Sequence, residues 1–239
     1  QGVKQTVRHN TNVIGTQRIL GYCAKYGVRK VVVVSQHQVY GANPTNPSLI
    51  GEDMPLKAAA RRGELRDFIE FDHVCRSWMY EHGRNPMVLL RPVFTLGPNI
   101  RSGFLYHYLS LRRPPMATGF NPMIQIMHEE DVAEAVSCAL KAKARGIYNV
   151  TGAAAIPVLR LLREMSRKPR SVPHPLLYPA DNLLFRFNLS PLPAGSLQFI
   201  QYNCVVDGTR IRKQLNYKPV KQLSDILGEF TTSHSTVLA

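Results

Sequence analysis

Short apolar runs alternate along this chain with longer segments whose apolar residues recur at helical spacing. The clearest run is Val31–Val34, four consecutive valines that follow Gly27 and precede the more polar stretch Ser35–Gly41. An unbroken β-branched run of this length is typical of a strand buried on both faces, and such strands occur in parallel sheets covered by helices. Met87–Leu90 shows the same pattern. We predict that the two runs form parallel strands of one sheet.

Segments with apolar residues at every third or fourth position predict the helices. We expect helices over residues 6–26, 64–82, 103–112, 131–141, 158–166, 176–188, 195–202, 207–215 and 222–230. Further strands are expected at 124–127 and 146–150, and an Asn- and Pro-rich loop at 41–57. Strands alternate with helices up to residue 150 and helices dominate after it, which predicts an α/β fold with a smaller, mostly helical lobe.

The net charge of +14 bears on what the chain binds. The excess is spread along the chain, +8 over residues 1–150 and +6 over 151–239. A diffuse basic surface favours anionic ligands such as nucleotides, and nucleic acid or an acidic lipid would fit it too. A merely solvated basic surface explains the same charge with fewer assumptions. No RNP, zinc-finger or KH-type signature supports nucleic-acid recognition.

The four cysteines are far apart and form no CxxC pair. This spacing predicts free thiols in a reducing compartment, so we expect a cytoplasmic protein, and it predicts no metal-ligating residues. No apolar run approaches the roughly 18 to 20 residues of a membrane span, and we expect no membrane partner.

Seven short motifs occur in a fixed order over nearly the whole chain. They are Asn12-x-x-Gly15-Thr16, Val31 to Gly41, Glu52-Asp53-x-Pro55-Leu56, Leu90-Arg91-Pro92 to Gly97-Pro98, His128 to Ala133, Gly146 to Gly152, and Asp207 to Pro219. On these motifs the chain resembles an atypical extended short-chain dehydrogenase/reductase of the NAD-dependent epimerase/dehydratase family.

The resemblance implies a Rossmann-type parallel sheet and a division of the chain into two parts. Residues 1–97, with 124–150 returning, would form the C-terminal part of an NAD(P)-binding domain, and 98–239 mainly a substrate-binding lobe. It also implies NAD or NADP as cofactor, a sugar nucleotide or a similar alcohol or ketone as ligand, and it leaves a homodimer open. In such sheets ligands bind beyond the carboxyl ends of the strands. The residues expected at the cofactor are Asn12, Ser35, Gln36, Pro92 and Val93.

Two departures from the family pattern concern function. The Gly-rich turn that holds the pyrophosphate is absent from the sequence, and nothing before Asn12 supplies it. The pattern implies that roughly 60 to 90 residues, two to three βα units, precede this segment in the family. We therefore expect a fragment of a longer or split protein, and we expect that the isolated chain does not bind NAD tightly.

The second departure is the catalytic set. The family uses a serine and a helical Tyr-x-x-x-Lys pair, in which the ammonium lowers the pKa of the phenol. Here Gln36 stands at the serine position, Phe68 at the tyrosine position and Asp72 at the lysine position. The string Tyr-x-x-x-Lys occurs twice, at 26–30 and at 217–221. The first contains Gly27 at a predicted helix end and the second contains Pro219, so neither places its tyrosine and lysine on one helical face.

Two histidines remain as candidates for proton transfer. His37 follows the strand at Val31–Val34 and is the best-placed substitute base, although a purely structural position is the simpler interpretation. His128 precedes three acids at the start of a predicted helix, where the acids complement the helix dipole. We interpret His128 as structural.

The sequence therefore leaves two hypotheses. The first is an NAD(P)-binding, epimerase/dehydratase-like enzyme whose Ser/Tyr/Lys set is replaced and which acts on, or senses, a sugar-nucleotide-like ligand. The second is a non-catalytic dinucleotide-binding scaffold, or an RNA-binding relative of the short-chain dehydrogenases. The replaced catalytic set favours the second hypothesis, while the retained motifs favour nucleotide binding in both.

Overall fold

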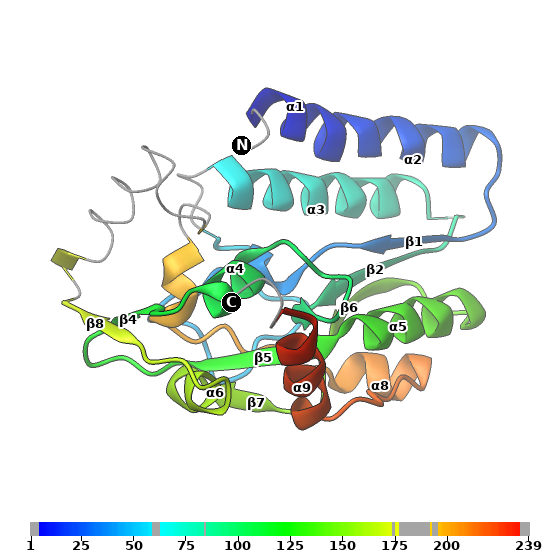
Figure 1. Ribbon diagram of the computed structural model, residues 1–239. Coiled ribbons are helices and arrows are strands. Elements are labelled where there is room, and N and C mark those ends of the chain that lie inside the picture. The colour runs from blue at the N-terminus through cyan, green and yellow to red at the C-terminus, as the bar shows by residue number, and fades with distance from the viewer. Residues whose placement is uncertain are drawn as a thin grey trace.

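The computed structural model describes residues 5–58, 63–83, 85–173, 175–176, 192 and 196–234 (Figure 1). The helices are α1 (Gln5–His9), the π-helical segment η1 (Asn10–Ile14), α2 (Gly15–Lys25), the 3-10 turn η2 (His37–Tyr40), α3 (Gly63–Glu81), α4 (Phe104–Ser110), α5 (Glu129–Lys141), α6 (Val158–Glu164), the 3-10 turn η3 (Ser196–Ile200), α8 (Thr209–Leu215) and α9 (Leu223–His234). The strands are β1 (Val31–Val34), β2 (Met87–Pro92), β3 (Phe94–Leu96), β4 (Pro115–Ala117), β5 (Met123–His128), β6 (Gly146–Val150), β7 (Ala155–Pro157) and β8 (Arg170–Val172).

The two apolar runs form neighbouring parallel strands, as predicted. In the sheet β1-β2-β6, Val31 pairs with Met87 and Val34 with Leu90, and β2 pairs in parallel with β6. A second sheet, β3-β5-β7, contains a parallel and an antiparallel pair, and β4 pairs with β8. Residues 146–150 thus join the sheet of β1 and β2, while 123–128 belong to the second sheet.

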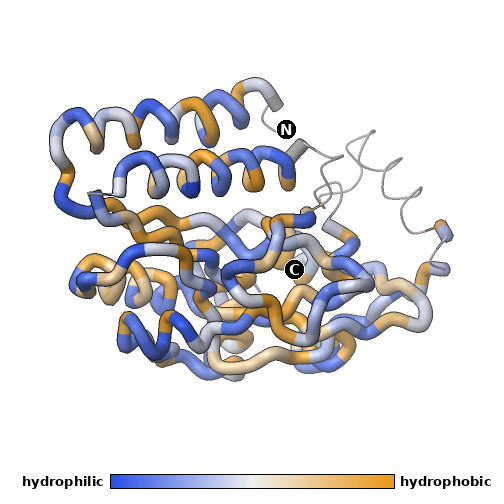
Figure 2. The backbone as a smooth tube through the Cα atoms, turned by 180° about the vertical axis from the view of Figure 1, so that it is seen from behind, coloured by the Kyte–Doolittle hydropathy of each residue, from blue (hydrophilic) through white to orange (hydrophobic). Residues whose placement is uncertain are grey.

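The alternation of side chains along β2 assigns its two faces to different helices. Met87 and Leu89 pack with Leu20 of α2 and with Cys75 and Trp78 of α3. Figure 1 shows α2 and α3 stacked on one side of the sheet and α5 on the other. In Figure 2, seen from behind, the same two helices alternate between blue and orange along their length, as expected for amphipathic helices.

The opposite face of β2 is covered by α5. Val88 and Leu90 lie in the larger core cluster, together with Ala135 and Ala139 of that helix. Both faces of β2 are therefore buried, and each residue of the strand is buried. This burial explains the unbroken apolar run of the strand.

The expectation that Val31–Val34 is buried on both faces is wrong. Val31, Val32 and Val33 are only half-buried, and Val34 is 44% exposed. The reason is the place of β1 in the sheet: among the described residues it pairs with β2 alone, so its other edge is open. An interior strand and an edge strand can carry the same run of valines, and the run alone does not separate them.

Eight of the nine predicted helices are found within a few residues, two of them with qualifications. The helix expected over 6–26 is α1, η1 and α2, an α-helix interrupted by one π-helical turn. The helix expected over 195–202 is the 3-10 turn η3. Residues 177–188 of the helix expected over 176–188 lie outside the described part. The strands that went unpredicted, β3, β4, β7 and β8, have three residues each, too few to show a period.

Candidate functional site

A cavity of about 410 Å³ lies beyond the carboxyl end of β1, where ligands bind in open α/β sheets. Its walls come from the exit of β1, the segment from β2 into β3, the start of α4 and the first turn of α5. The lining residues are Val34, Ser35, Gln36, His37, Gln38, Pro92, Val93, Phe94, Thr95, Ile100, Ser102, Gly103, Phe104, Leu105, Tyr106, Glu129 and Val132. The lining is mainly apolar and contains no lysine or arginine among the described residues.

The structure brings together four of the five residues predicted at the cofactor. Ser35, Gln36, Pro92 and Val93 all line the cavity, whereas Asn12 lies in η1 and is not part of the lining. Gln36 has an extended backbone, and its Nε2 is buried without a hydrogen-bond partner in the described chain. A buried donor without a partner is costly, and a ligand oxygen would relieve that cost.

His37 also lines the cavity, in a fixed orientation. Its Nδ1 lies 3.2 Å from the Pro92 carbonyl oxygen, which only accepts, so Nδ1 carries the proton in this bond. The ring meets Phe94 edge to face at 4.5 Å, and Nε2 has no partner within the described residues. Burial lowers the pKa of His37 to about 4, although the Pro92 carbonyl opposes the shift. At neutral pH the imidazole is uncharged, and Nε2 is a hydrogen-bond acceptor.

Asp72, which the sequence comparison predicts at the lysine position of the family, is fully buried in an ion pair with Arg91. Arg91 donates from Nη2 to Asp72 Oδ1 at 2.6 Å and from Nε to Oδ2 at 2.8 Å, and neither side chain is exposed. This is the bidentate geometry in which arginine binds carboxylates most strongly. Burial tends to lower the pKa of Arg91, but the hydrogen bonds and charge of Asp72 outweigh it, and the pKa is raised.

The ion pair extends into a buried polar network. Ser35 Oγ donates to Asp72 Oδ2 at 3.2 Å, and Arg91 Nη1 donates to the Tyr40 hydroxyl at 2.6 Å. Tyr40 in turn donates to Asn149 Oδ1 at 2.8 Å. Burial raises the pKa of Tyr40 to about 12, against the opposing effect of Arg91. The network therefore holds a neutral phenol and a paired carboxylate.

The geometry of the strands explains why these side chains meet. Arg91 has the same parity as Met87 and Leu89, so it points toward α3. Asp72 lies one turn before Cys75, on the face of α3 that packs against the sheet. The sequence carries a signal for this pair that the motif comparison alone does not reveal. An acid on the apolar face of a helix and an arginine at the end of an apolar strand each need a buried partner.

Phe68, which is predicted at the tyrosine position of the family, packs half-buried against the main core. Neither Phe68 nor Asp72 is among the described residues that line the cavity. The structure thus separates the predicted set: Gln36 and His37 face the cavity, while Asp72 belongs to the network beneath it.

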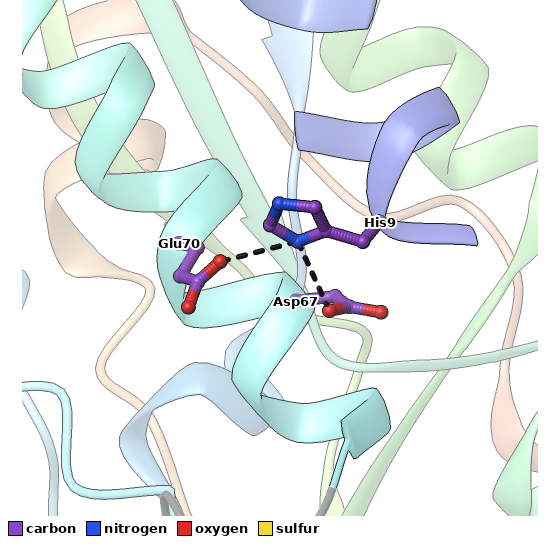
Figure 3. Close-up of side chains that lie close together, drawn as sticks. All are labelled: His9, Asp67 and Glu70. Carbon is purple, nitrogen blue, oxygen red and sulfur yellow. Dashed lines mark ion pairs between the residues drawn. The ribbon is translucent and has the colours of Figure 1, made fainter. Parts of the chain in front are cut away.

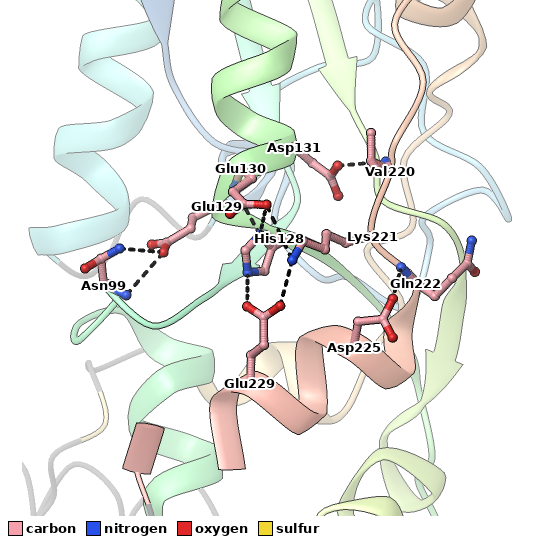
Figure 4. A network of polar contacts seen from close by, with 10 residues as sticks. All are labelled: Asn99, His128, Glu129, Glu130, Asp131, Val220, Lys221, Gln222, Asp225 and Glu229. Atoms are coloured by element: carbon pink, nitrogen blue, oxygen red, sulfur yellow. Dashed lines mark hydrogen bonds and ion pairs between the residues drawn. The ribbon is translucent and has the colours of Figure 1, made fainter. Parts of the chain in front are cut away.

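His128 has a structural position at the N-terminus of α5 (Figure 4). Its Nδ1 accepts the backbone N–H of Glu130, so Nε2 donates to Glu229 Oε2 of α9 at 2.9 Å. Lys221 completes the group, with Nζ 2.7 Å from Glu229 Oε1. These contacts fasten α9 to the start of α5, and His128 is not among the residues that line the cavity.

A mainly parallel arrangement of strands, helices on both faces of the first sheet and a cavity beyond its carboxyl end define a Rossmann-type α/β protein. Residues 3–151 match the model of the NAD dependent epimerase/dehydratase family, which is more than half of the chain, and the chain belongs to this family.

Curated relatives resemble the chain over most of its length. The uncharacterized protein Rv0501 of Mycobacterium tuberculosis is 26% identical over 87% of this chain, and the uncharacterized protein y4nG of Sinorhizobium fredii is 27% identical over 88%. The match covers 55% and 54% of these two proteins, so the chain spans about half the length of the curated relatives it matches.

Solved structures share the fold at low identity. A UDP-glucuronic acid 4-epimerase from Bacillus cereus, in complex with UDP-glucuronic acid and NAD, has a TM-score of 0.71 at 16% identity, over 95% of this chain and 68% of its own. DesIV, a dTDP-glucose 4,6-dehydratase from Streptomyces venezuelae with NAD and TYD bound, has a TM-score of 0.73 at 19% identity, over 98% and 68%. In the described part of our chain, no helix is long and apolar enough to span a membrane.

Proposed function

We propose that this chain is an epimerase/dehydratase-family protein that binds a sugar-nucleotide-like ligand without the tyrosine-driven hydride chemistry of its family. The observation that carries the proposal is the buried Asp72–Arg91 pair. The family reaction needs a phenol with an ammonium one turn away. Here Phe68 has no proton to give, and Asp72 is an anion already paired within the fold. A carboxylate at that position would raise the pKa of a nearby phenol.

The residues at the cavity fit the nicotinamide end of NAD or NADP. The unpartnered Gln36 Nε2 would donate to a carboxamide oxygen, and Ser35, Pro92 and Val93 would form the surrounding wall. Among the described residues, the lining of the cavity offers no lysine or arginine to the pyrophosphate. When bound, the nicotinamide would accept or donate hydride. The contribution of this chain would be to hold and orient the ring.

His37 would position a ligand rather than drive proton transfer. Its free Nε2 would accept a hydrogen bond from a ligand hydroxyl. With a pKa of about 4, however, the imidazole is a weak base at neutral pH, and general bases work best when their pKa lies near the working pH. Gln36 would donate a hydrogen bond to a ligand oxygen but would not relay a proton as serine does.

A non-catalytic dinucleotide-binding scaffold is the second candidate. It is favoured by the same network, because Asp72 is paired with Arg91 and Phe68 packs against the core, so neither is free for chemistry. The ligands named for the solved relatives, UDP-glucuronic acid and NAD, support the choice of probes. They do not separate a sensor from an enzyme with residual activity.

Turnover of UDP-glucuronic acid and UDP-glucose in the presence of NAD or NADP tests the proposal. The protein and its His37→Ala variant are assayed beside a UDP-glucuronic acid 4-epimerase as positive control. Epimers are followed by chromatography and reduced cofactor by absorbance. We expect turnover well below the roughly 1 to 1,000 per second typical of enzymes. Ordinary rates that His37→Ala leaves unchanged would contradict both the loss of catalysis and any role for His37.

Calorimetric titration of the same chain with NAD and NADP measures the affinity for the cofactor and is the second test of the proposal. We expect affinity weaker than micromolar, because the described cavity has no lysine or arginine that could pair with a pyrophosphate. A parallel titration with UDP-glucuronic acid that shows weak binding, without turnover in the assay above, would fit a sensor. Micromolar affinity for NAD or NADP would contradict the expectation of weak dinucleotide binding.

A further inference from the structure

A second group of polar side chains lies away from the cavity, where α1 packs against α3. His9 is the last residue of α1, and Asp67 and Glu70 stand one turn apart on α3. Figure 3 shows the imidazole of His9 lying over α3, with both carboxylates turned toward its Nδ1. Among the described residues, this is a group of three potential metal ligands whose donor atoms all lie within 4.8 Å of one another.

Two of the three separations between donor atoms are close to those of a tetrahedral metal site before any ion is added. His9 Nδ1 lies 3.2 Å from Glu70 Oε2 and 3.5 Å from Asp67 Oδ1. A tetrahedral ion with bonds of about 2.0 to 2.1 Å holds its donor atoms about 3.3 Å apart. An ion bound by these three donor atoms would replace the direct contacts between the imidazole and the two carboxylates.

Arginines hold the outer oxygen of each carboxylate. Arg8 Nε lies 2.7 Å from Asp67 Oδ2, and Arg66 Nε lies 2.7 Å from Glu70 Oε1. The inner oxygens, Oδ1 of Asp67 and Oε2 of Glu70, are left facing the imidazole. Partners of this kind orient the ligands of metal sites and fix which oxygen binds.

The three ligands differ in burial: one is buried beneath the site and two are partly exposed to solvent. The Asp67 side chain is 2% exposed, whereas His9 is 36% and Glu70 30% exposed. A π-helical segment, η1, begins directly after His9, and π-helical turns inside α-helices are frequent at functional sites. The buried carboxylate would be shielded from water, and an ion would enter past the two partly exposed ligands.

We propose that His9, Asp67 and Glu70 bind Zn²⁺, with the fourth position open to water or to an external ligand. One imidazole nitrogen and two carboxylate oxygens suit zinc better than calcium or magnesium, which prefer oxygen ligands alone. The ion would link α1 to α3 on a face of α3 different from the one that carries Asp72. The sequence analysis predicted no metal-ligating residues, because it considered only the spacing of the cysteines. His9 and Asp67 are 58 residues apart and meet only through helix packing.

Zinc calorimetry combined with thermal unfolding tests the proposal. We expect saturable binding to the wild type and a rise in Tm, because an ion that binds only the folded state stabilises it. His9→Ala and Glu70→Gln each remove a ligand and should weaken zinc affinity at least about tenfold. His73→Ala, on the exposed side of the same helix, is the matched control and should bind zinc as the wild type does. Calcium should raise Tm in none of them.

Glu70→Gln keeps the test informative if other variants fold poorly, because Glu70 is partly exposed and its replacement keeps the size of the side chain. Equal zinc affinity in the wild type, His9→Ala and Glu70→Gln would overturn the proposal and assign binding to the thiols or to other histidines. Absence of saturable zinc binding to the wild type would overturn it as well, and would leave an ion pair between His9 and the two carboxylates.

Discussion

At the scale of single residues, His37 makes the stability of the protein depend on pH. Its pKa is about 4 in the folded protein, below the ordinary value of 6.5, because burial disfavours the imidazolium. As pH falls below 6.5, His37 becomes protonated in the unfolded chain but stays neutral in the folded protein. Stability is therefore lost between pH 6.5 and pH 4. The loss attributable to His37 should reach about 3 kcal/mol.

Urea unfolding of the wild type and His37→Gln between pH 7 and pH 4 measures this loss. The difference in free energy of unfolding between the two proteins should shift in favour of the variant as pH falls. A constant difference over that range would show that His37 is not buried as a neutral ring. The two proteins share all other histidines, so the effect of those residues on stability cancels in the difference between them.

At the scale of elements, the loop after η2 depends on Gly41. Its φ of +72° and ψ of 148° lie in a region that only glycine adopts readily, and a Cβ there would come 2.7 Å from the Ala58 Cα. Gly41→Ala should destabilise the protein by at least about 2 kcal/mol. Gly51→Ala is the matched control: a Cβ at Gly51 meets no atom within 4 Å. Equal midpoints of urea unfolding for the two variants would contradict this account.

Elements were easier to predict than their surroundings. Unbroken apolar runs located β1 and β2, and the helical period of apolar residues located α3 and α5, since that period reflects which side of a helix is buried. The same pattern did not reveal that β1 pairs with β2 alone among the described residues, because the valine run has no feature that depends on its neighbours. The three-residue strands have no period, and pairing alone creates them.

At the scale of the whole molecule, the family and the place of the cavity followed from ordered motifs, while the chemistry of the site depended on contacts distant in sequence. Ser35, Gln36, Pro92 and Val93 meet as expected, since strand ends gather at one edge of the sheet. Arg91 reaches Asp72 across 19 positions, and His9 reaches Asp67 across 58. The sequence indicates that Asp72 and Arg91 each need a buried partner, but local spacing does not identify which residue that partner is.

The buried pair also limits how the family chemistry can be restored. Asp72→Lys would place an ammonium beside the guanidinium of Arg91, in a site with no exposed surface. Two buried like charges are strongly unfavourable. The combined change Phe68→Tyr with Asp72→Lys therefore tests catalysis only when Arg91 is changed as well.

A double-mutant cycle on Asp72 and Arg91 tests the central claim most directly. Asp72→Asn, Arg91→Met and the double variant are unfolded in urea beside the wild type. Each single change should cost about 3 to 5 kcal/mol, because it leaves the other charge buried and unpaired. The double variant should lose less than the sum of the two, by at least about 2 kcal/mol. Single effects that add to within about 0.5 kcal/mol would show that the two residues are not paired and that Asp72 remains free for a ligand.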